Sequence, residues 1–497
     1  MSPRLLVSCS VLVRYRCGIV FAILVTLLFS ITIAAQDLSS APPIRNDGMI
    51  DYSQTRTVYV MINATATYEL DSAFQVITHD TNSLAVLNHA ISDASLLNGS
   101  LVVYKGTYQV SGTINMKSNV NMTLQDGVFI NATTSSNIIS FLSVSNSAIR
   151  ANSNATIHGS RGNGQRGIYL RHCSGIAISA NRTDGFTFYD IGHSWIDGLN
   201  VNNSIFQNLH GYLWMTSFAF PWHGMLFDGL QNCQLINITS DGLNGDSRSA
   251  LCIGGQTYRT NNVNITGGLY ENSYFDNGIY LGGWEQPVTN IRIINVTTAH
   301  NNAAATGHSG IKIRPACNVT VAGWVSNDDF NGMEMDTTAD SEGNTYNTGG
   351  SWYNSISGTV NYPRNAGLIL DLFGSNKDQS IMYNTFHLVI NNATQSGVYI
   401  DNGYAGTPCA ISYNTIYLNA TGCRKQAIDF SSSSGTVTYN TVFGRFVQNG
   451  KGGFPDIAFE NLTGQKYNVI NVYSTSGNPN GLYSGGLGTN VVNYPYT

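Results

Sequence analysis

A short strand pattern of alternating apolar and polar residues recurs along most of the chain. Each copy starts with a small residue and carries apolar side chains at its second and fourth positions. The copies are Gly167-Ile-Tyr-Leu-Arg171, Ala250-Leu-Cys-Ile-Gly254, Gly278-Ile-Tyr-Leu-Gly282, Gly310-Ile-Lys-Ile-Arg314, Gly332-Met-Glu-Met-Asp336, Gly367-Leu-Ile-Leu-Asp371, Gly397-Val-Tyr-Ile-Asp401 and Ala427-Ile-Asp-Phe-Ser431. The later copies lie 22 residues apart at the closest, from Gly310 to Gly332, and 35 at the widest, from Gly332 to Gly367. Strands that repeat at such intervals are typical of a solenoid rather than of a globular core.

Further strands and polar turns rich in Asn and Gly separate the copies. Val263–Thr266 and Ile291–Asn295 are examples of such intervening strands. The turns supply left-handed backbone positions and side-chain amides that can stack from one rung to the next, a rung being one turn of the solenoid. The sequence therefore predicts an all-β chain folded as a parallel β-helix. A β-sandwich also has many short strands, but it favours two-residue hairpins and lacks this repeat.

The segment before the repeats predicts one short helix and then the first strands of the solenoid. Apolar residues at helical spacing are Leu84, Leu87, Ile91 and Ala94, preceded by the capping residues Thr81, Asn82 and Ser83. The apolar period then switches to two in Leu101–Tyr108, Gly112–Met116 and Val120–Leu124. We expect this helix to cap the N-terminal end of the solenoid.

The same opening segment resembles a known superfamily. The helix followed by Tyr104-Lys-Gly-Thr-Tyr-Gln-Val-Ser-Gly-Thr-Ile-Asn-Met-Lys-Ser-Asn-Val-Asn-Met-Thr-Leu124 resembles the first rungs of the pectate-lyase-like superfamily, which includes pectate lyases, polygalacturonases, alginate epimerases and phage tailspikes. The pattern covers residues 70–470, and the likeness in residue detail is confined to this segment. The resemblance implies a right-handed parallel β-helix whose outer face handles polysaccharide.

The N-terminus predicts export from the cytoplasm. Arg4, Arg14 and Arg16 precede an uncharged run from Cys17 to Ala35, which ends in small residues. This is the layout of a secretory signal peptide, and because the run approaches the roughly 20 residues needed to cross a bilayer, an uncleaved anchor is the alternative. We predict residues 1–35 as signal or anchor, 36–69 as an N-terminal extension and 70–497 as one β-helix domain, secreted or at the cell surface.

Composition narrows the partner classes. Only 11% of the residues are charged and the net charge is −5, with no basic stretch, which excludes a nucleic-acid footprint. Cys409 and Cys423 are close enough in sequence to form a disulfide outside the cell, and the other cysteines after the signal are expected as buried thiols. Sequons at Asn63, Asn264 and Asn461 permit glycosylation.

The repeat also sorts residues by face. Side chains alternate across a strand, so the apolar second and fourth positions fill the core while the third and fifth positions point outward. The first outer column, from the third positions, reads Cys252, Tyr280, Lys312, Glu334, Ile369, Tyr399 and Asp429. The second outer column, from the fifth positions, reads Gly254, Gly282, Arg314, Asp336, Asp371, Asp401 and Ser431.

The two outer columns contain most of the candidate functional residues of the sequence. Lys312, Arg314, Glu334 and Asp336 form a compact patch of two bases and two acids, and we take them as candidate catalytic residues. Candidate substrate-binding residues around the patch are Tyr280, His308, Tyr399 and Asp429, and the glycines at 254 and 282 leave room for a ligand. The alternative is a solvated, salt-bridged face without a function.

A row of acids continues from this patch. Neighbouring rungs lie about 4.8 Å apart, so Asp336, Asp371 and Asp401 should raise one another's pKa values unless a cation or a shared proton compensates them. In a lyase or epimerase that acts on uronates, Lys312 or Arg314 would be the base and the three aspartates would hold Ca²⁺ against the substrate. In a glycoside hydrolase, acids about 6.5–9.5 Å apart suit inversion. Glu334 with Asp336, or Asp336 with Asp401, fall near that range.

The motifs of two subfamilies are not reproduced. Polygalacturonases carry Asn-x-Asp, Asp-Asp, Gly-His-Gly and Arg-x-Lys in chain order, whereas here Gly307-His-Ser-Gly310 and Lys312-Ile-Arg314 precede Asn327-Asp-Asp329. The Asp-Pro-His-Asp signature of alginate epimerases is absent. The leading reading is a polyuronate lyase, followed by an inverting hydrolase. The rival from another class is a non-catalytic glycan-binding or adhesin-like protein, because a fold does not fix a function.

Two further groups precede the charged rungs. The first combines aromatic and titratable side chains that could extend a sugar-binding groove: Asp190, His193, Trp195, Asp197, Trp214, Trp222 and His223. Packing of a loop is the alternative reading. Asp241 and Asp246 resemble loose calcium ligands, although their spacing matches no loop motif.

Overall fold

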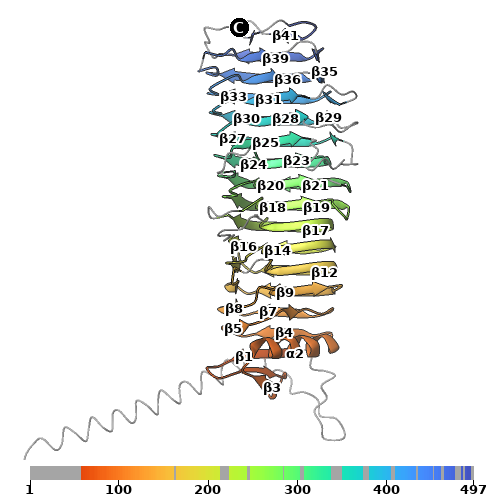
Figure 1. Cartoon of the computed structure of the whole chain (residues 1–497), viewed down its shortest axis with the longest axis vertical. Coiled ribbons are helices and arrows are strands. Elements are labelled where there is room, and N and C mark those ends of the chain that lie inside the picture. Colours follow the sequence, from red (N-terminus) through yellow and green to blue (C-terminus); the bar gives the residue numbers. More distant parts are fainter. Residues whose placement is uncertain are drawn as a thin grey trace, which may run out of the picture.

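The chain folds as a long stack of β-strand rungs, ordered along the axis from the N-terminal to the C-terminal end (Figure 1). The computed structural model describes residues 57–161, 164–212, 223–242, 247–283, 285–302, 307–336, 350–372, 380–403, 409–431, 435–451, 453–460, 464–475, 483–484 and 487–493. Successive rungs pair in parallel, so the predicted parallel β-helix is confirmed. Within this part of the chain, no helix combines the length and the apolar character that a membrane crossing requires.

The strands that carry the repeated motif form one column, in which each strand pairs in parallel with the next. Its members are β6 (Ile114–Asn115), β9 (Ile139–Leu142), the start of β12 (Ile168–Ala180), β14 (Ile196–Asn202), the start of β17 (Met225–Asp241), β18 (Leu251–Gly254), β20 (Ile279–Gly282), β23 (Ser309–Arg314), β25 (Asn331–Asp336), β28 (Leu368–Leu372), β31 (Val398–Asn402), β34 (Ile428–Ser431), β37 (Ile457–Phe459) and β40 (Tyr483–Ser484). We call this the motif sheet.

The remaining strands of each rung complete the wall of the solenoid. One set comprises β4 (Ser100–Val103), β7 (Asn121–Leu124), β10 (Ser145–Ala151), β15 (Ile205–Gln207), β19 (Thr260–Glu271), β21 (Val288–Ile294), β24 (Cys317–Asn327), β27 (Ser355–Asn361), β30 (Thr385–Asn391), β33 (Thr415–Thr421), β36 (Thr441–Val447), β39 (Val469–Ser474) and β41 (Val491–Asn493). The other set comprises β5 (Gly106–Val110), β8 (Val128–Ala132), β11 (Ala155–His158), β13 (Phe186–Tyr189), β16 (Leu209–Tyr212) and β22 (Thr297–Ala299). A separate five-stranded sheet is built from β26 (Ser351–Trp352), β29 (Ser380–Met382), β32 (Ala410–Ser412), β35 (Thr436–Thr438) and β38 (Gln465–Lys466).

Apolar side chains from every rung fill the interior. The second and fourth motif positions are buried as predicted, for example Ile311 and Ile313 of β23 and Met333 and Met335 of β25, and all four belong to one continuous core cluster. Cys423 carries a buried free thiol, so the disulfide expected between Cys409 and Cys423 is not formed. Its burial raises the pKa of this thiol to about 12, consistent with a packing role.

A buried asparagine ladder ties the later rungs together. Its members are Asn354, Asn384, Asn414, Asn440, Asn468 and Asn490. The side chain of Asn384 donates to that of Asn414 at 2.9 Å, and Asn414 donates in turn to Asn440 at 2.9 Å. This stacking of amides between rungs is the arrangement that the polar turns predicted. The residue before each of the first five members is an exposed tyrosine in the left-handed region, Tyr353, Tyr383, Tyr413, Tyr439 and Tyr467, and these rings stack on one another.

The N-terminal end of the stack combines the predicted helix with three strands. Helix α2 spans Ser83–Leu96, and the Asn82 side chain accepts from the amide of Leu84 as its N-cap. Its apolar face joins the core, whereas β1 (Thr57–Ile62), β2 (Thr67–Leu70) and β3 (Val76–Asp80) form an antiparallel extension. Figure 1 shows α2 and these strands at the N-terminal end, where a capping role for the helix stays a prediction. Since β1 also pairs with β4, ordered strand begins before residue 70, where we expected the domain to start.

Candidate functional site

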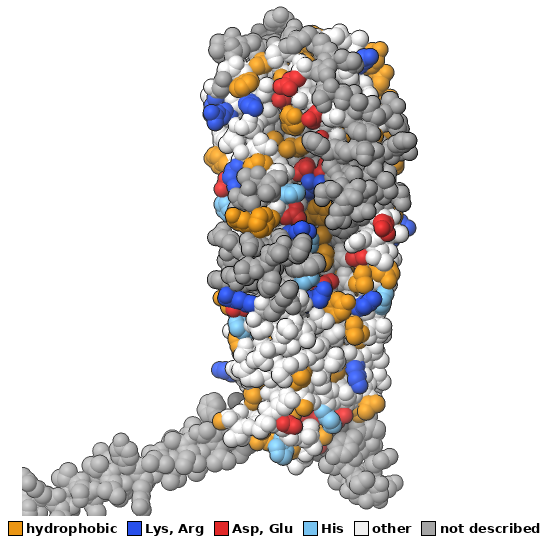
Figure 2. Space-filling view, viewed as in Figure 1, with side chains coloured by type: hydrophobic (Ala, Val, Ile, Leu, Met, Phe, Trp, Pro, Cys, Tyr) orange, Lys and Arg blue, Asp and Glu red, His pale blue; other side chains and the backbone are white. Residues whose placement is uncertain are grey.

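The motif sheet stacks its outer residues in the register that the repeat predicted. Along the first outer column, Cα pairing joins Tyr280 to Lys312, Lys312 to Glu334, and Tyr399 to Asp429. Along the second, Asp336 pairs with Asp371 and Asp371 with Asp401. Figure 2 shows acidic and basic side chains following one another along the long axis of this face. The alignment of the repeats therefore placed the charged residues correctly relative to one another.

The same residues are not a solvated face, which corrects the simplest expectation for outward positions. Lys312 and Asp336 are each only 2% exposed, and Glu334 is 7% exposed. Tyr280 is also buried, and a Cβ on Gly282 would collide with its ring. Gly282 therefore makes room for the Tyr280 ring rather than for a ligand. Alternation assigned these side chains to the outer side of the strands, but it carries no information about how far that side is exposed to solvent.

The four charges of the patch neutralise one another. Lys312 Nζ donates to Glu334 Oε1 at 2.8 Å and lies 3.0 Å from Asp336 Oδ2. Arg314 donates from Nε and Nη2 to the two oxygens of Asp336 at 2.7 and 2.6 Å. Ser309 donates to the remaining oxygen of Glu334 at 3.1 Å. Every carboxylate oxygen of the patch thus has a partner, as a buried charge network requires.

This pairing fixes the protonation states of the patch. Burial lowers the pKa of Lys312, but attraction to Asp336 and Glu334 more than offsets it, so the pKa lies above its ordinary value. Burial also opposes ionisation of Asp336, yet Arg314 and Lys312 together hold its pKa well below the usual range. Lys312 is therefore a protonated, doubly engaged ammonium, and Asp336 is a permanently ionised carboxylate.

The pKa values of two aspartates beyond the patch are shifted in the opposite direction. Asp371 is 8% exposed, and its Oδ1 has no hydrogen-bond partner among the described residues. Burial, followed by repulsion from Asp401 and Asp336, raises the pKa of Asp371 to about 9. Burial and repulsion from Glu460 likewise raise the pKa of Asp429 to about 7. At neutral pH Asp371 therefore keeps its proton beside the ionised Asp336, which is the mutual pKa effect expected from the sequence.

Tyr399 and Asp401 border this acid on the next rung. The Tyr399 hydroxyl donates to Asp401 Oδ2 at 3.2 Å. Burial raises the pKa of Tyr399 to about 12, so the phenol keeps its proton. Asp401 is only partly buried, in contrast to Asp371. A group that approaches from solvent would therefore meet Asp401 and Tyr399 beside the buried acid.

One of the three aspartates predicted as calcium ligands is already bonded to basic side chains. Asp336 already accepts from Arg314 and Lys312, which leaves Asp371 and Asp401 of the three predicted calcium ligands. Among the described side chains, the one group of three or more metal-ligating residues with ligand atoms within 4.8 Å of one another lies elsewhere, at Glu69, His89 and Asp93. Calcium binding by the acidic column stays a prediction.

His308 is close enough to the patch to feel the charges of Lys312, Arg314 and Asp336, and it also lies beside Asp276, which the repeated motif does not include. His308 Nδ1 is 3.6 Å from Asp276 Oδ1, and burial lowers the pKa of the imidazole. Asp276 and His308 each stand two residues before the first residue of a motif copy, Gly278 and Gly310. Extending the repeat alignment by two positions would have found the pair.

The described residues of the aromatic group that precedes the charged rungs do not form a surface on which a sugar could stack. Trp195 is fully buried and packs against Phe188 in the core. Asp197 is bonded to Arg166, and burial lowers the pKa of His193 to about 3, which leaves a neutral imidazole. The remaining members are Asp190, which pairs with Arg161 at 3.0 Å, and His223, whose pKa burial lowers to about 4. Trp214, Trp222 and Asp246 lie outside the described residues.

Solved structures of known proteins share this architecture, whereas neither a protein-family model nor a curated protein sequence matches the chain. A mutant tailspike protein of E. coli bacteriophage HK620, in complex with a pentasaccharide, is 11% identical with a TM-score of 0.53, over 84% of this chain and 75% of that chain. The catalytic unit of a GH87 α-1,3-glucanase from Streptomyces thermodiastaticus is 13% identical with a TM-score of 0.46, over 82% and 66%. A family 28 exopolygalacturonase of Yersinia enterocolitica is 10% identical with a TM-score of 0.43, over 82% of each chain. At these identities the likeness concerns the fold alone, and this fold is consistent with the resemblance of the opening segment to the pectate-lyase-like superfamily.

Proposed function

We propose that the protein is a glycoside hydrolase that cleaves a polysaccharide, with Asp371 as the general acid. The observation that carries the proposal is the buried position of this residue between Asp336 and Asp401 on the neighbouring rungs. A general acid must hold its proton at the working pH and release it to the leaving oxygen. Asp371, with a pKa raised to about 9 by burial and by Asp401, meets the first condition at any pH up to that value.

The second carboxyl group of the reaction is Asp401 in this proposal. It lies on the neighbouring rung, is partly exposed and carries the Tyr399 hydroxyl on one oxygen. Neighbouring rungs lie about 4.8 Å apart, which is closer to the roughly 5–5.5 Å of retaining hydrolases than to the 6.5–9.5 Å of inverting ones. The expectation of inversion rested on Glu334 with Asp336 or on Asp336 with Asp401, and Asp336 is too firmly held by Arg314 to act as a base. We therefore propose retention for the pair Asp371 and Asp401.

The pairing of the bases weighs against the lyase reading. Elimination requires a base that is unprotonated at the working pH. Lys312 has a raised pKa and touches two carboxylates, and Arg314 is held by both oxygens of Asp336. Neither side chain is suited to remove a proton from a uronate. We propose instead that Lys312 and Arg314 keep Asp336 ionised, and that the negative charge of Asp336 helps Asp371 to retain its proton.

The ligand class follows from the fold and from the predicted export signal. The tailspike that shares the fold was solved with a pentasaccharide, and an acidic column beside a protonated acid offers groups that recognise sugar hydroxyls. A polysaccharide outside the cytoplasm is therefore the substrate we propose. The test below includes both neutral and acidic polysaccharides, with calcium and with chelator, so that it distinguishes the two kinds of glycan.

The test measures new reducing ends and absorbance at 235 nm on neutral and acidic polysaccharides, with calcium and with chelator. We expect reducing ends without an absorbance gain in the wild type, and none from Asp371→Asn. The matched control is Asp126→Asn, an exposed acid on an early rung. Absorbance growth would establish the lyase instead. Glycan binding without any product would assign the face to a non-catalytic binding protein.

A further inference from the structure

The most informative group outside the motif sheet lies at the N-terminal end, between β2 and α2. Glu69 belongs to β2, and His89 and Asp93 stand one turn apart on α2. His89 Nδ1 is 2.6 Å from Glu69 Oε2 and 3.8 Å from Asp93 Oδ2. Of all the His, Cys, Asp and Glu side chains that the structure describes, these alone gather three ligand atoms within 4.8 Å.

A hydrogen bond between Glu69 and His89 does not account for the whole arrangement. The Glu69 side chain is fully buried, yet its Oε1 has no hydrogen-bond partner in the described part of the chain. A buried carboxylate oxygen without a partner costs free energy that a bound cation would recover. His89 is 51% exposed and Asp93 is 31% exposed, so an ion can reach the group from solvent.

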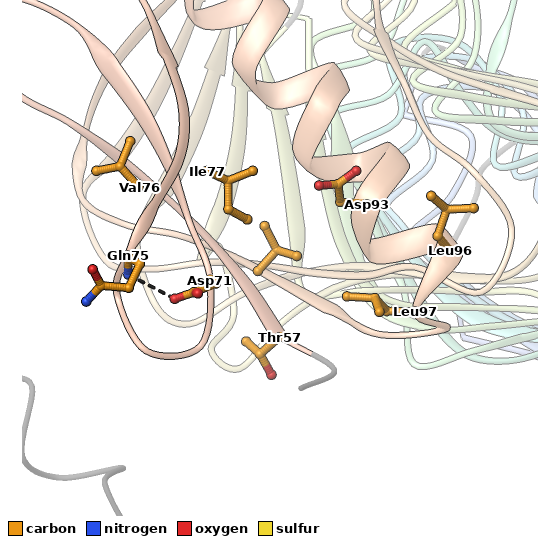
Figure 3. A pocket seen from close by; sticks show the side chains of 9 residues that line it. Thr57, Asp71, Gln75, Val76, Ile77, Asp93, Leu96 and Leu97 are labelled. Carbon is orange, nitrogen blue, oxygen red and sulfur yellow. Dashed lines mark hydrogen bonds between the residues drawn. The ribbon is translucent and has the colours of Figure 1, made fainter. Parts of the chain in front are cut away.

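Space for further ligands adjoins the group. An open cavity of about 540 Å³ lies beside the helix, and Asp93 is one of its lining residues together with Asp71 and Gln75. Figure 3 shows the Asp93 carboxylate directed from α2 into this cavity, with Ile77 of β3 opposite. Water in the cavity can therefore complete the coordination of an ion that the three side chains hold.

We propose that Glu69, His89 and Asp93 bind one divalent transition-metal ion, of which Zn²⁺ is the best match. One imidazole nitrogen with two carboxylate oxygens is a set that Zn²⁺ accepts, whereas Ca²⁺ prefers oxygen alone. Ligand atoms that share a zinc at about 2.0–2.2 Å lie roughly 3.3 Å apart, and the separations of 2.6 and 3.8 Å lie on either side of that value. Because the ion would be bound by residues of both α2 and β2, it would stabilise the N-terminal end of the solenoid.

The test titrates the chelator-treated full-length protein with ZnCl₂ by calorimetry and follows its thermal unfolding. We expect one Zn²⁺ per chain and a higher Tm with zinc, and at least tenfold weaker binding with no Tm gain in the double variant His89→Ala/Asp93→Asn. The matched control is His79→Ala. His79 is an exposed histidine of β3 whose ring stacks on Tyr68. This variant should bind Zn²⁺ as tightly as the wild type does.

Three outcomes would overturn the site: no zinc bound by the wild type, equal binding by the double variant, or the same loss in His79→Ala. Circular dichroism of each variant separates misfolding from loss of a ligand. If the double variant misfolds, the single Asp93→Asn variant, which changes a partly exposed side chain, carries the comparison. Asp371→Asn should bind zinc like the wild type, so this result does not depend on the hydrolase proposal.

Discussion

Arg314 donates two hydrogen bonds to Asp336, from Nε at 2.7 Å and from Nη2 at 2.6 Å, and both side chains are largely withdrawn from water. The two residues stand on neighbouring strands of the motif sheet, β23 and β25. This pair sets the state of the rungs around it, because it keeps Asp336 ionised directly below Asp371. The patch and the acidic column thus interact electrostatically. The patch holds Asp336 in its ionised form, and the charge of Asp336 helps Asp371 to keep its proton.

Removing the charge of Asp336 should destabilise the protein. Asp336→Asn keeps the shape of the side chain but leaves the buried cations Lys312 and Arg314 with Glu334 as their one remaining carboxylate in the patch. Breaking a buried ion pair by removing one partner costs about 3–5 kcal/mol. Urea unfolding followed by circular dichroism measures the loss. The exposed control Asp126→Asn should change the free energy of unfolding by less than about 0.5 kcal/mol, and an equal loss in both variants would contradict the account.

Replacing Asp371 with asparagine should leave stability unchanged or raise it, while it strongly reduces activity. Asparagine resembles the protonated acid but does not have to take up a proton on folding, so Asp371→Asn removes that free-energy cost without leaving a charge unpaired. We expect an unchanged or higher Tm, with turnover reduced by about 10²–10⁴-fold, as for loss of a general acid. Paired thermal and kinetic measurements on one preparation test both parts. A large drop in Tm would show that Asp371 is ionised and paired, and would remove it as the proton donor.

The sequence predicted the register of the site because the repeat is strict on one strand per rung. Aligning Gly310-Ile-Lys-Ile-Arg314 with Gly332-Met-Glu-Met-Asp336 was enough to bring Lys312 beside Glu334, which the hydrogen bond of 2.8 Å confirms. Alternation fixes the face on which a side chain lies, and parallel stacking fixes its neighbours on the adjacent rungs. These two rules are local, so a single sequence contains them.

Burial of the outer columns was not predictable in the same way. Lys312 and Asp336 lie outside the core cluster and are nevertheless buried. Burial of this kind depends on the tertiary structure around the strands rather than on the repeat itself. The role of Gly282 was misjudged for the same reason, since its neighbour in space is the ring of Tyr280.

The sequence also contains a second repeat, which lies in the turns rather than in the strands. The dipeptide Tyr-Asn recurs at residues 353–354, 383–384, 413–414, 439–440 and 467–468. Its asparagines form the buried ladder and its tyrosines form the exposed stack, with ring centroids 5.1–5.3 Å apart. Left-handed backbone at each tyrosine turns the chain so that the two neighbours point to opposite sides. The apolar pattern of the strands does not contain this signal, because it lies in the residues of the turns.

The asparagine ladder should be among the least tolerant parts of the solenoid. Asn414 donates to the carbonyl of Ile381 and to Asn440 at 2.9 Å each, and accepts from the amide and side chain of Asn384. Asn414→Ala leaves several buried polar groups unsatisfied at about 1–3 kcal/mol each, so we expect a loss above about 3 kcal/mol. Asn419→Ala, which changes an exposed asparagine of β33, the strand that Asn414 immediately precedes, should cost less than about 0.5 kcal/mol. Equal unfolding midpoints in urea would contradict the structural role of the ladder.

Asp371 should also impose a distinctive pH dependence on the protein. Its pKa is about 9 in the folded state against an ordinary value of 3.8. Between these values the folded protein binds more protons at this site than the unfolded chain, so the contribution of Asp371 to stability falls as the pH rises and is lost by about pH 9. Asp371→Asn removes that slope, so the difference in Tm between the variant and the wild type should grow from pH 5 to pH 9. Activity should hold up to about pH 9 and decline above it as the acid ionises. A decline that began near pH 5 would place the proton on a group with an ordinary pKa and would remove Asp371 from the reaction.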